Sequence, residues 1–415
     1  MISHFLNKIF NENTQLKINI LFFLYIFCYL IGPAVINIYV TLLALSSLFY
    51  LVKNLKLFNK LVKDRTSLIL IILCGYIITK DFFLGSLNID FLSFLRFVII
   101  FLSISIFLIK KDRFFSLKYY PLIFLNLILF FDTFFQYIFG FNLVGFDKYQ
   151  SDRLTSFFND EPIIGSFLMK ISLPIIFYLI HNKFQNSYTF SFILISIFCV
   201  MISGERMPFL QLCFGILLIF LIKFGLNFKK IASFIAIFLL GSFVLLNLPN
   251  VKERYISTFQ GFLSLYQDIK NENQIVHQIS KNGVYDYYLN FQSGIQLWKK
   301  NYFFGNGYRY YNSNCNTALS DEFNVGCSTH PHNIYIEILS DHGVLGLALF
   351  LLFIIFCSYD YFKNLRDSSS VGFYITLLVI SVPFVTSQSI FSSFYGSIYF
   401  LSFFIIRFMT NLKIN

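Results

Sequence analysis

Charged side chains are scarce in this sequence. Asp, Glu, Lys and Arg make up 13% of its 415 residues, whereas hydrophobic residues make up 57%, and the mean hydropathy is +0.68. An ordinary soluble domain carries about 25% charged residues, and its surface needs them. A water-soluble globular protein is therefore excluded, and we predict a protein that lies within a lipid bilayer.

Sequence motifs for nucleotide binding are also missing. The sequence contains neither the G-x-x-x-x-G-K-[ST] phosphate loop nor a G-x-G-x-x-G fingerprint, and it has no internal repeat or low-complexity tract. These absences argue against an ATP-driven pump and against an enzyme that uses a nucleotide sugar inside the cell. We therefore expect any chemistry on the outer face of the membrane.

Cysteine is uncommon, with seven residues in the chain, and five of these fall in apolar runs where they are expected to pack: Cys28, Cys74, Cys199, Cys213 and Cys357. The other two, Cys315 and Cys327, share one large hydrophilic segment. An oxidising outer compartment would allow a disulfide between them, and two free thiols are the alternative.

Long apolar runs fill most of the chain. A membrane-spanning helix needs about 20 apolar residues, and the runs at 66 and 371 are short enough to be re-entrant. The twelve runs are 16–32, 34–52, 66–79, 91–109, 119–139, 163–180, 188–203, 208–222, 231–248, 334–357, 371–386 and 389–406. We predict an all-α integral membrane protein with about twelve transmembrane helices. We predict that residues 1–415 form one polytopic domain, with one large outer loop, 249–332, before the tenth span.

The distribution of basic residues sets the predicted orientation. The formal net charge is +11, and Lys and Arg gather on alternate connections: Lys53, Lys56, Lys60, Lys63 and Arg65; Lys110, Lys111, Arg113 and Lys118; Lys183; Lys223, Lys229 and Lys230; Lys363 and Arg366. Basic loops stay in the cytoplasm, so both termini are predicted to be cytoplasmic. The charge is thereby explained by topology, and no nucleic-acid partner is expected. The first apolar run has no cleavage site and is interpreted as an anchor.

Three segments, 140–162, 203–207 and 249–332, are then predicted to face outward. The strongest pattern lies at the end of the third, where Pro331 and His332 precede the tenth span. Pro is tolerated in a first helical turn, so the helix is expected to begin near His330. The positive end of a helix disfavours imidazolium and attracts anions. His332 is therefore a candidate base beside a phosphate site, and a histidine that only caps the helix is the alternative.

Asn333, Glu337 and Asp341 recur every four residues in this predicted span. This spacing places three polar groups on one face of a helix, and carboxylates are costly in lipid. We expect this face to look into a cavity within the protein.

Arginines near the outer membrane edge are candidate anion ligands. Arg206 follows Glu205 in a tight outer turn, so its partner is either Glu205 or a substrate diphosphate, whose oxygens match a guanidinium fork. Arg153 precedes Asp160 and Glu161, which are interpreted as helix-capping residues, arginine partners or metal ligands. Arg309 follows a glycine pair.

These motifs resemble the O-antigen ligase and O-antigen polymerase superfamily of bacterial membrane glycosyltransferases. The ligase pattern of His, Asn, nine residues, Gly, two residues and Gly is met by His332, Asn333, Gly343 and Gly346, and the Arg-x3-Leu pattern is met by Arg206 and Leu210. Residues 294–311 resemble the loop motif of the family, although Tyr302 stands where proline is common. The resemblance covers residues 150–350 through its motifs.

The resemblance implies an inverting glycosyltransferase of the bacterial inner (cytoplasmic) membrane with a periplasmic active site. The donor would be an undecaprenyl-diphosphate-linked glycan, and the acceptor either lipid A-core, for a ligase, or a second lipid-linked glycan, for a polymerase. His332 would be the catalytic base. Arg206 would bind the diphosphate, with Arg153, Arg309, Asn333 and Glu337 as further substrate ligands. Membrane lipid is the surrounding partner, and no cofactor and no metal are expected.

Two alternatives to a ligase remain open. The two motifs favour a ligase over a polymerase only slightly, because short motifs do not encode the acceptor. A flippase for lipid-linked glycans, or another transporter, would account for the charges at Arg96, Asp132 and Lys170 within apolar runs. It would leave the His332 motif unexplained.

Overall fold

Helices make up most of the part of this chain that the structure describes. The computed structural model describes residues 14–86, 89–110, 117–149, 153–225, 247, 249–270, 283–315, 328–363, 370–383 and 386–410. Within these ranges, β-structure is limited to two isolated bridges, Phe141 with Asp147 and Tyr149 with Arg153. The all-α fold class predicted from the sequence is confirmed.

In chain order, the helices are α2 (Thr14–Ile31), α3 (Pro33–Lys53), α4 (Phe58–Lys63), α5 (Arg65–Phe83), α6 (Phe91–Lys110), α7 (Tyr120–Phe139), α8 (Ile164–His181), α9 (Asn186–Ile202), α10 (Arg206–Phe224), α12 (Pro249–Lys270), α13 (Gly283–Lys300), α14 (Tyr310–Asn314), α15 (Ile334–Lys363), α16 (Val371–Ile380) and α17 (Ser393–Phe408). The 3-10 turns η1 (Leu55–Leu57) and η2 (Ser156–Phe158) complete the set in the described ranges.

Seven of the described helices are long and apolar enough to cross a membrane: α3, α5, α6, α7, α8, α10 and α15. Four shorter apolar helices, α2, α9, α16 and α17, coincide with further predicted spans. The predicted span 231–248 lies outside the described residues except for Asn247. The chain is thus a multi-pass membrane protein, and the count of twelve spans stays a prediction.

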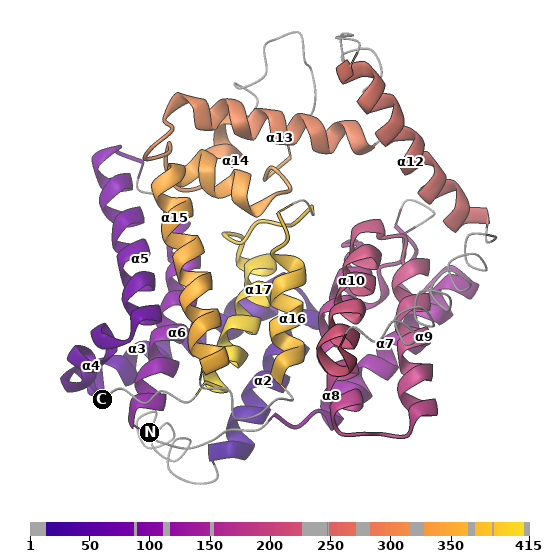
Figure 1. The fold of residues 1–415 in the computed structure, drawn as a ribbon, viewed down its shortest axis with the longest axis horizontal. Coiled ribbons are helices and arrows are strands. Elements are labelled where there is room, and N and C mark those ends of the chain that lie inside the picture. The colour runs from indigo at the N-terminus through magenta and orange to yellow at the C-terminus, as the bar shows by residue number, and fades with distance from the viewer. Residues whose placement is uncertain are drawn as a thin grey trace.

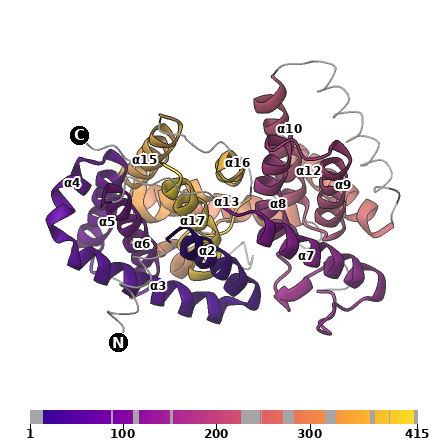
Figure 2. The same cartoon turned by 90° about the horizontal axis from the view of Figure 1, so that it is seen from below.

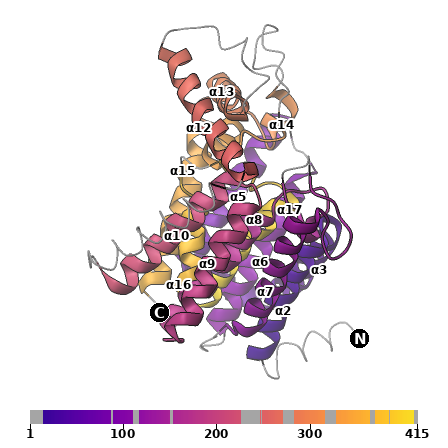
Figure 3. The ribbon, with the colours of Figure 1, turned by 90° about the vertical axis from the view of Figure 1, so that its right-hand side faces the viewer.

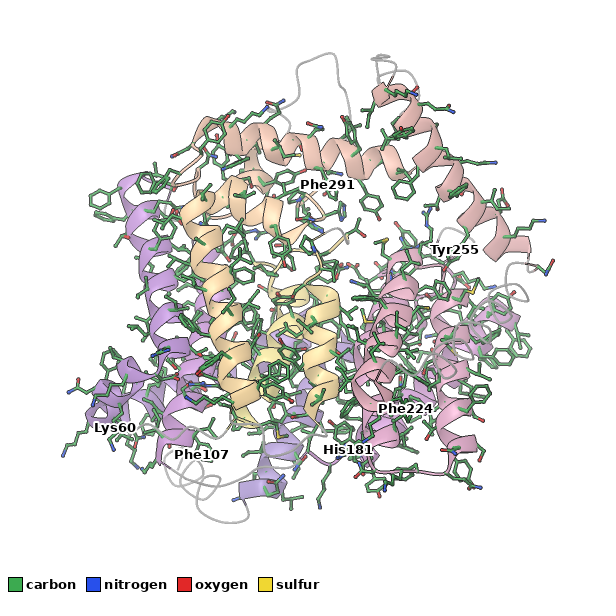
Figure 4. All side chains as sticks on the ribbon, in the orientation of Figure 1. Lys60, Phe107, His181, Phe224, Tyr255 and Phe291 are labelled. Atoms are coloured by element: carbon green, nitrogen blue, oxygen red, sulfur yellow. The ribbon has the colours of Figure 1, made fainter. Side chains whose placement is uncertain are left out.

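The helices form two groups. Figure 2 shows α3, α5, α6 and α15 on one side, α7 to α10 on the other, and α16 between them. The helices α12, α13 and α14 lie together at one end of the molecule (Figures 1 and 3), and α4 lies toward the opposite end (Figure 1). Figure 4 likewise places Tyr255 of α12 and Phe291 of α13 far from Lys60 of α4.

Helix α16 is the shortest of the apolar helices. Its 10 residues rise about 15 Å, which is half of the hydrocarbon thickness. The sequence predicted spans over 371–386 and 389–406, but α16 ends at Ile380 and α17 begins after Ser392, whose side chain accepts a hydrogen bond from the Tyr395 N–H. Non-helical backbone at membrane depth is tolerated where it lines a cavity within the protein.

Helix α15 bends at Gly343, which has φ 65 within the helix. The bend frees two N–H groups, and Val344 and Leu345 donate them to the carbonyls of Tyr302 and Phe303, at 3.0 and 3.2 Å. A Cβ on Gly343 would lie 2.4 Å from the Phe303 carbonyl oxygen. The bend is therefore the docking site of the 302–307 loop. It also gives a physical role to Gly343, the first of the two glycines in the ligase pattern that begins at His332.

Buried charged residues of α5 contact α15 near the same bend. Lys80 forms an ion pair with Asp81 at 3.1 Å and donates to the Asp341 carbonyl at 2.6 Å. Its ammonium also lies 2.9 Å from His342 Nδ1. These contacts join α5 to the part of α15 that precedes the bend.

The outer segment contains two longer helices before α14. Helix α12 runs over Pro249–Lys270, α13 runs over Gly283–Lys300, and residues 271–282 lie outside the described part. Cys315 is disulfide-bonded, and Cys327 lies outside the described residues, so its identity as the partner stays a prediction.

Candidate active site

A cavity of about 600 Å³ lies between the two helix groups, beneath the outer helices α12 and α13. Its wall is formed by α8, α10, α12, α13, α16, α17 and the loops that precede α8, α15 and α17. Three of the predicted site residues, Arg153, Arg206 and His332, line this one cavity although they are far apart in the sequence.

Arg206 is the first residue of α10 and lies at the cavity rim. Its Nη1 donates to the Thr258 hydroxyl of α12. The ion pairs formed among the described residues involve Lys80, Arg309 and Arg407, and none involves Arg206. Its guanidinium therefore faces the cavity without a carboxylate from the described part of the chain bound to it.

Glu205 directly precedes Arg206 in the sequence, but its side chain caps a different helix, α8. Its carboxylate accepts the Gly165 and Ser166 N–H groups, at 2.6 and 3.2 Å, and so caps α8. Burial raises the pKa of Glu205 to about 7, against the opposing effects of Arg153, of these two N–H groups and of Lys170. The local ion pair between Glu205 and Arg206, one of the two partners considered from the sequence, is not formed.

Arg153 approaches the cavity from the loop before α8. Its Nη2 donates to the Pro162 carbonyl at 2.9 Å, and its buried Nε has no hydrogen-bond partner in the described part of the chain. Glu161 lines the same wall and accepts the Tyr395 hydroxyl at 2.8 Å. Because Glu205 caps α8, the capping role considered for Asp160 and Glu161 is filled by a residue distant in sequence.

His332 lies two residues before α15, not within its first turn as the sequence suggested. It has φ 53, in the left-handed region, and its carbonyl accepts the Ser387 N–H at 2.7 Å. Its ring lies nearly perpendicular to that of Tyr287 of α13, at a centroid distance of 5.0 Å. The loop before α17 and the outer helix α13 together fix the direction of this imidazole.

The rings of His330 and His332 lie close together, with centroids 4.3 Å apart and planes tilted by 60°. Burial lowers the pKa of His332 to about 4. Burial, and then the neighbouring His332, lowers the pKa of His330 to about 3. Both rings are therefore neutral at pH 7, and the His332 ring is able to accept a proton.

Three further predicted site residues do not line this cavity. Asn333 caps α15 by accepting the Tyr335 and Ile336 N–H groups, at 3.0 and 3.1 Å. Glu337 is buried and accepts the Ser389 hydroxyl. Arg309 pairs with Asp90 at 3.0 Å.

The polar face of α15 thus packs against protein, contrary to the expectation of a cavity along it. Asp341, the third member of the four-residue pattern, accepts the Tyr311 N–H at 3.0 Å and holds the outer loop. The spacing identified buried polar groups correctly, but it did not distinguish a loop partner from an open cavity.

Sequence reasoning missed two parts of the cavity. Thr386, Ser387, Gln388 and Ser389 line it from the segment between α16 and α17. The predicted spans 371–386 and 389–406 left only Ser387 and Gln388 between them. Lys170 of α8 also lines it, although the sequence noted this residue only as a buried charge. The run of small polar residues between two apolar runs was the available signal.

The arrangement suits an anionic ligand and a proton acceptor. Arg153, Lys170 and Arg206 supply positive charge, and His332 supplies a neutral imidazole in the same cavity. Among the described residues, no group of three His, Cys, Asp or Glu is close enough to hold a metal ion.

The sequence matches one family of known proteins. Residues 191–351 match the family model described as O-antigen ligase, a stretch that extends from α9 into α15 and includes Arg206 and His332. No curated protein matches the chain.

Proposed function

Because the chain belongs to the superfamily of O-antigen ligases and O-antigen polymerases, we propose that it transfers a glycan from undecaprenyl diphosphate to an acceptor hydroxyl. The observation that carries this proposal is the single cavity that joins Arg153, Arg206 and His332. A flippase requires no proton acceptor at this position, so the cavity favours an enzyme.

Arg206 binds the diphosphate leaving group in this proposal, with Arg153 beside it. A guanidinium presents paired N–H donors that match phosphate oxygens, and such charge-assisted hydrogen bonds are about twice as strong as neutral ones. As the bond between the anomeric carbon and the diphosphate breaks, its electron pair moves to the phosphate oxygen. Fixed cations stabilise this developing charge without having to reorganise.

His332 is the base in this proposal. The acceptor oxygen attacks the anomeric carbon from the side opposite the diphosphate, which inverts the configuration, and its proton passes to the imidazole. The pKa of His332, about 4 in the free protein, is low for a base at pH 7. A bound diphosphate adds negative charge to the cavity, which raises the pKa of an imidazole toward the range that suits general-base catalysis.

The positions of lysine residues indicate on which side of the membrane the cavity lies. The helices α12 and α13 cover the cavity. They lie at the end of the molecule opposite α4, which carries Lys60 and Lys63. The positive-inside rule assigns α4 to the cytoplasm. We therefore assign the cavity to the periplasmic face of the inner membrane, with both termini cytoplasmic.

The acceptor is proposed to be lipid A-core, which makes the protein an O-antigen ligase. This choice rests on the two motifs around Arg206 and His332. A polymerase that joins lipid-linked repeats uses the same donor chemistry, so the product must be identified directly.

The test is complementation of strains that lack either activity. Wild type, His332→Ala and Arg206→Ala are expressed at equal membrane levels, and lipopolysaccharide and undecaprenyl-linked glycans are separated on gels. We expect wild type to restore capped lipopolysaccharide in the ligase-deficient strain and both variants to fail. Lengthened lipid-linked chains would identify a polymerase instead.

Lys223→Met is the matched control, because Lys223 lies at the other end of α10 from Arg206, 3.2 Å from His181. It should complement as well as wild type does. Full complementation by both His332→Ala and Arg206→Ala would reject the assignment of the active site.

A further inference from the structure

Lys170 is a cation of the cavity wall to which neither the sequence motifs nor the family match gives a role. It lies within α8, a helix long and apolar enough to span the membrane, and it lines the cavity beside Arg206. Its ammonium donates no hydrogen bond to any described residue and takes part in none of the ion pairs formed among them.

The position of Lys170 along α8 sets its depth. Ser166 and Lys170 are four residues apart and both line the cavity. Because an α-helix rises 1.5 Å per residue, Lys170 lies about 6 Å further into the membrane than Ser166. Ser166 is bonded to Glu205, the neighbour of Arg206, at the rim. Lys170 therefore lies below the rim arginines.

The surroundings of Lys170 do not neutralise it. Glu205 has an electrostatic effect on Lys170, but its carboxylate accepts backbone N–H groups of α8. Gln211 of α10 and Tyr399 of α17, which are uncharged, also line the cavity. A lysine within a membrane-spanning helix is costly, and such residues are found where they face a ligand path or a partner.

We propose that Lys170 contacts the phosphate of the donor nearer to the lipid, while Arg206 and Arg153 contact the phosphate that carries the sugar. This inference rests on the proposed function and deepens it, because it assigns the two phosphates to two depths of the cavity. It also gives the site a means to prefer a polyprenyl diphosphate over a polyprenyl monophosphate.

The experiment measures the binding of undecaprenyl diphosphate and of undecaprenyl monophosphate to the purified full-length protein in nanodiscs. Wild type is compared with Lys170→Met, Lys170→Arg and Arg206→Ala. A hydrogen bond to a charged group contributes about 1.5 to 3 kcal/mol, so Lys170→Met should weaken diphosphate binding roughly tenfold or more. Its preference for diphosphate over monophosphate should shrink by a similar factor.

Three controls separate a lost contact from a lost fold. Methionine removes a charge from a membrane helix at nearly constant length, so Lys170→Met should melt no lower than wild type. Lys223→Met removes a lysine outside the cavity and should bind both lipids as wild type does. Lys170→Arg keeps the charge and should retain most of the diphosphate preference.

The possible results distinguish a failure of the role proposed for Lys170 from a failure of the proposed function. If Lys170→Met binds both lipids as wild type does while Arg206→Ala loses diphosphate binding, the role of Lys170 is rejected and the proposed function stands. If wild type binds neither lipid, or if Arg206→Ala also changes nothing, both proposals fail.

Discussion

At the scale of single residues, the site depends on which charges already have partners. Glu205 stands beside Arg206 in sequence, yet it accepts the backbone N–H groups of Gly165 and Ser166 instead. Within the described part of the chain, Arg206 is thereby left facing the cavity with a hydroxyl, that of Thr258, bound to it in place of a carboxylate. Such a cation beside a neutral imidazole is the local reason for proposing an anionic donor.

The pH dependence of activity follows from His332. Because burial holds its pKa at about 4 in the free protein, the imidazole keeps its proton-accepting form as the pH falls through the ordinary histidine value near 6.5. We expect kcat/KM for the donor to stay level between pH 8 and about pH 5.5. Initial transfer rates in proteoliposomes across this range give the measurement.

Glu205 must be distinguished from His332 in that profile, because its pKa of about 7 falls inside the range. Glu205→Gln keeps an acceptor for the α8 cap and removes the titration, and so serves as the control. A loss of activity centred near pH 6.5 that persists in Glu205→Gln would contradict the low pKa of His332.

At the scale of elements, the sequence predicted helices better than it predicted where they stop. Eleven apolar helices coincide with predicted spans because hydropathy depends on composition alone. The early end of α16 was missed, because residues 371–386 form one mostly apolar run in the sequence. The end of α16 is held to the start of α15 by bonds such as the one that Asn333 Nδ2 donates to the Pro383 carbonyl at 2.6 Å.

The bend in α15 supplies a prediction at this scale. In Gly343→Ala, the new Cβ would lie 2.4 Å from the Phe303 carbonyl oxygen, at a positive φ that alanine rarely adopts. We expect the variant to lose the docked 302–307 loop, to be destabilised by about 1 to 3 kcal/mol and to lose most activity. Melting temperature and transfer rate are the measurements.

The matched control is Gly75→Ala in α5, where an added Cβ meets no atom within 4 Å. Alanine is favoured over glycine within a helix by roughly 0.5 to 1 kcal/mol, so this variant should be as stable as wild type or more so. Equal behaviour of the two variants would show that the bend does not require glycine.

At the scale of the whole molecule, polar contacts hold the last helix to the early ones. Arg407 of α17 is buried, donates to the Asp64 carboxylate that caps α5, and bonds Ser105 of α6 at 2.9 Å. The motif residues could be identified from the sequence because each contributes a distinctive chemical group. The long-range partners of Arg407 and the cavity itself could not be predicted, because they depend on how the two helix groups pack.

Removing Arg407 should therefore loosen the bundle. Arg407→Met leaves the Asp64 carboxylate buried without its cation, and breaking a buried pair in this way costs about 3 to 5 kcal/mol. We expect a lower melting temperature in detergent, with Lys223→Met unchanged. The double variant Arg407→Met with Asp64→Asn should recover part of the loss. A single variant as stable as wild type would contradict the pairing.

Glycan transfer from a polyprenyl diphosphate in this cavity can be measured with the purified protein. The protein in proteoliposomes is given an undecaprenyl-diphosphate-linked glycan together with either lipid A-core or a second lipid-linked glycan, and the products are identified by mass. We expect transfer to one acceptor with release of undecaprenyl diphosphate, abolished in His332→Ala and Arg206→Ala and retained in Lys223→Met. Absence of transfer to either acceptor by folded wild type, or transfer that survives both cavity variants, would contradict the proposed function.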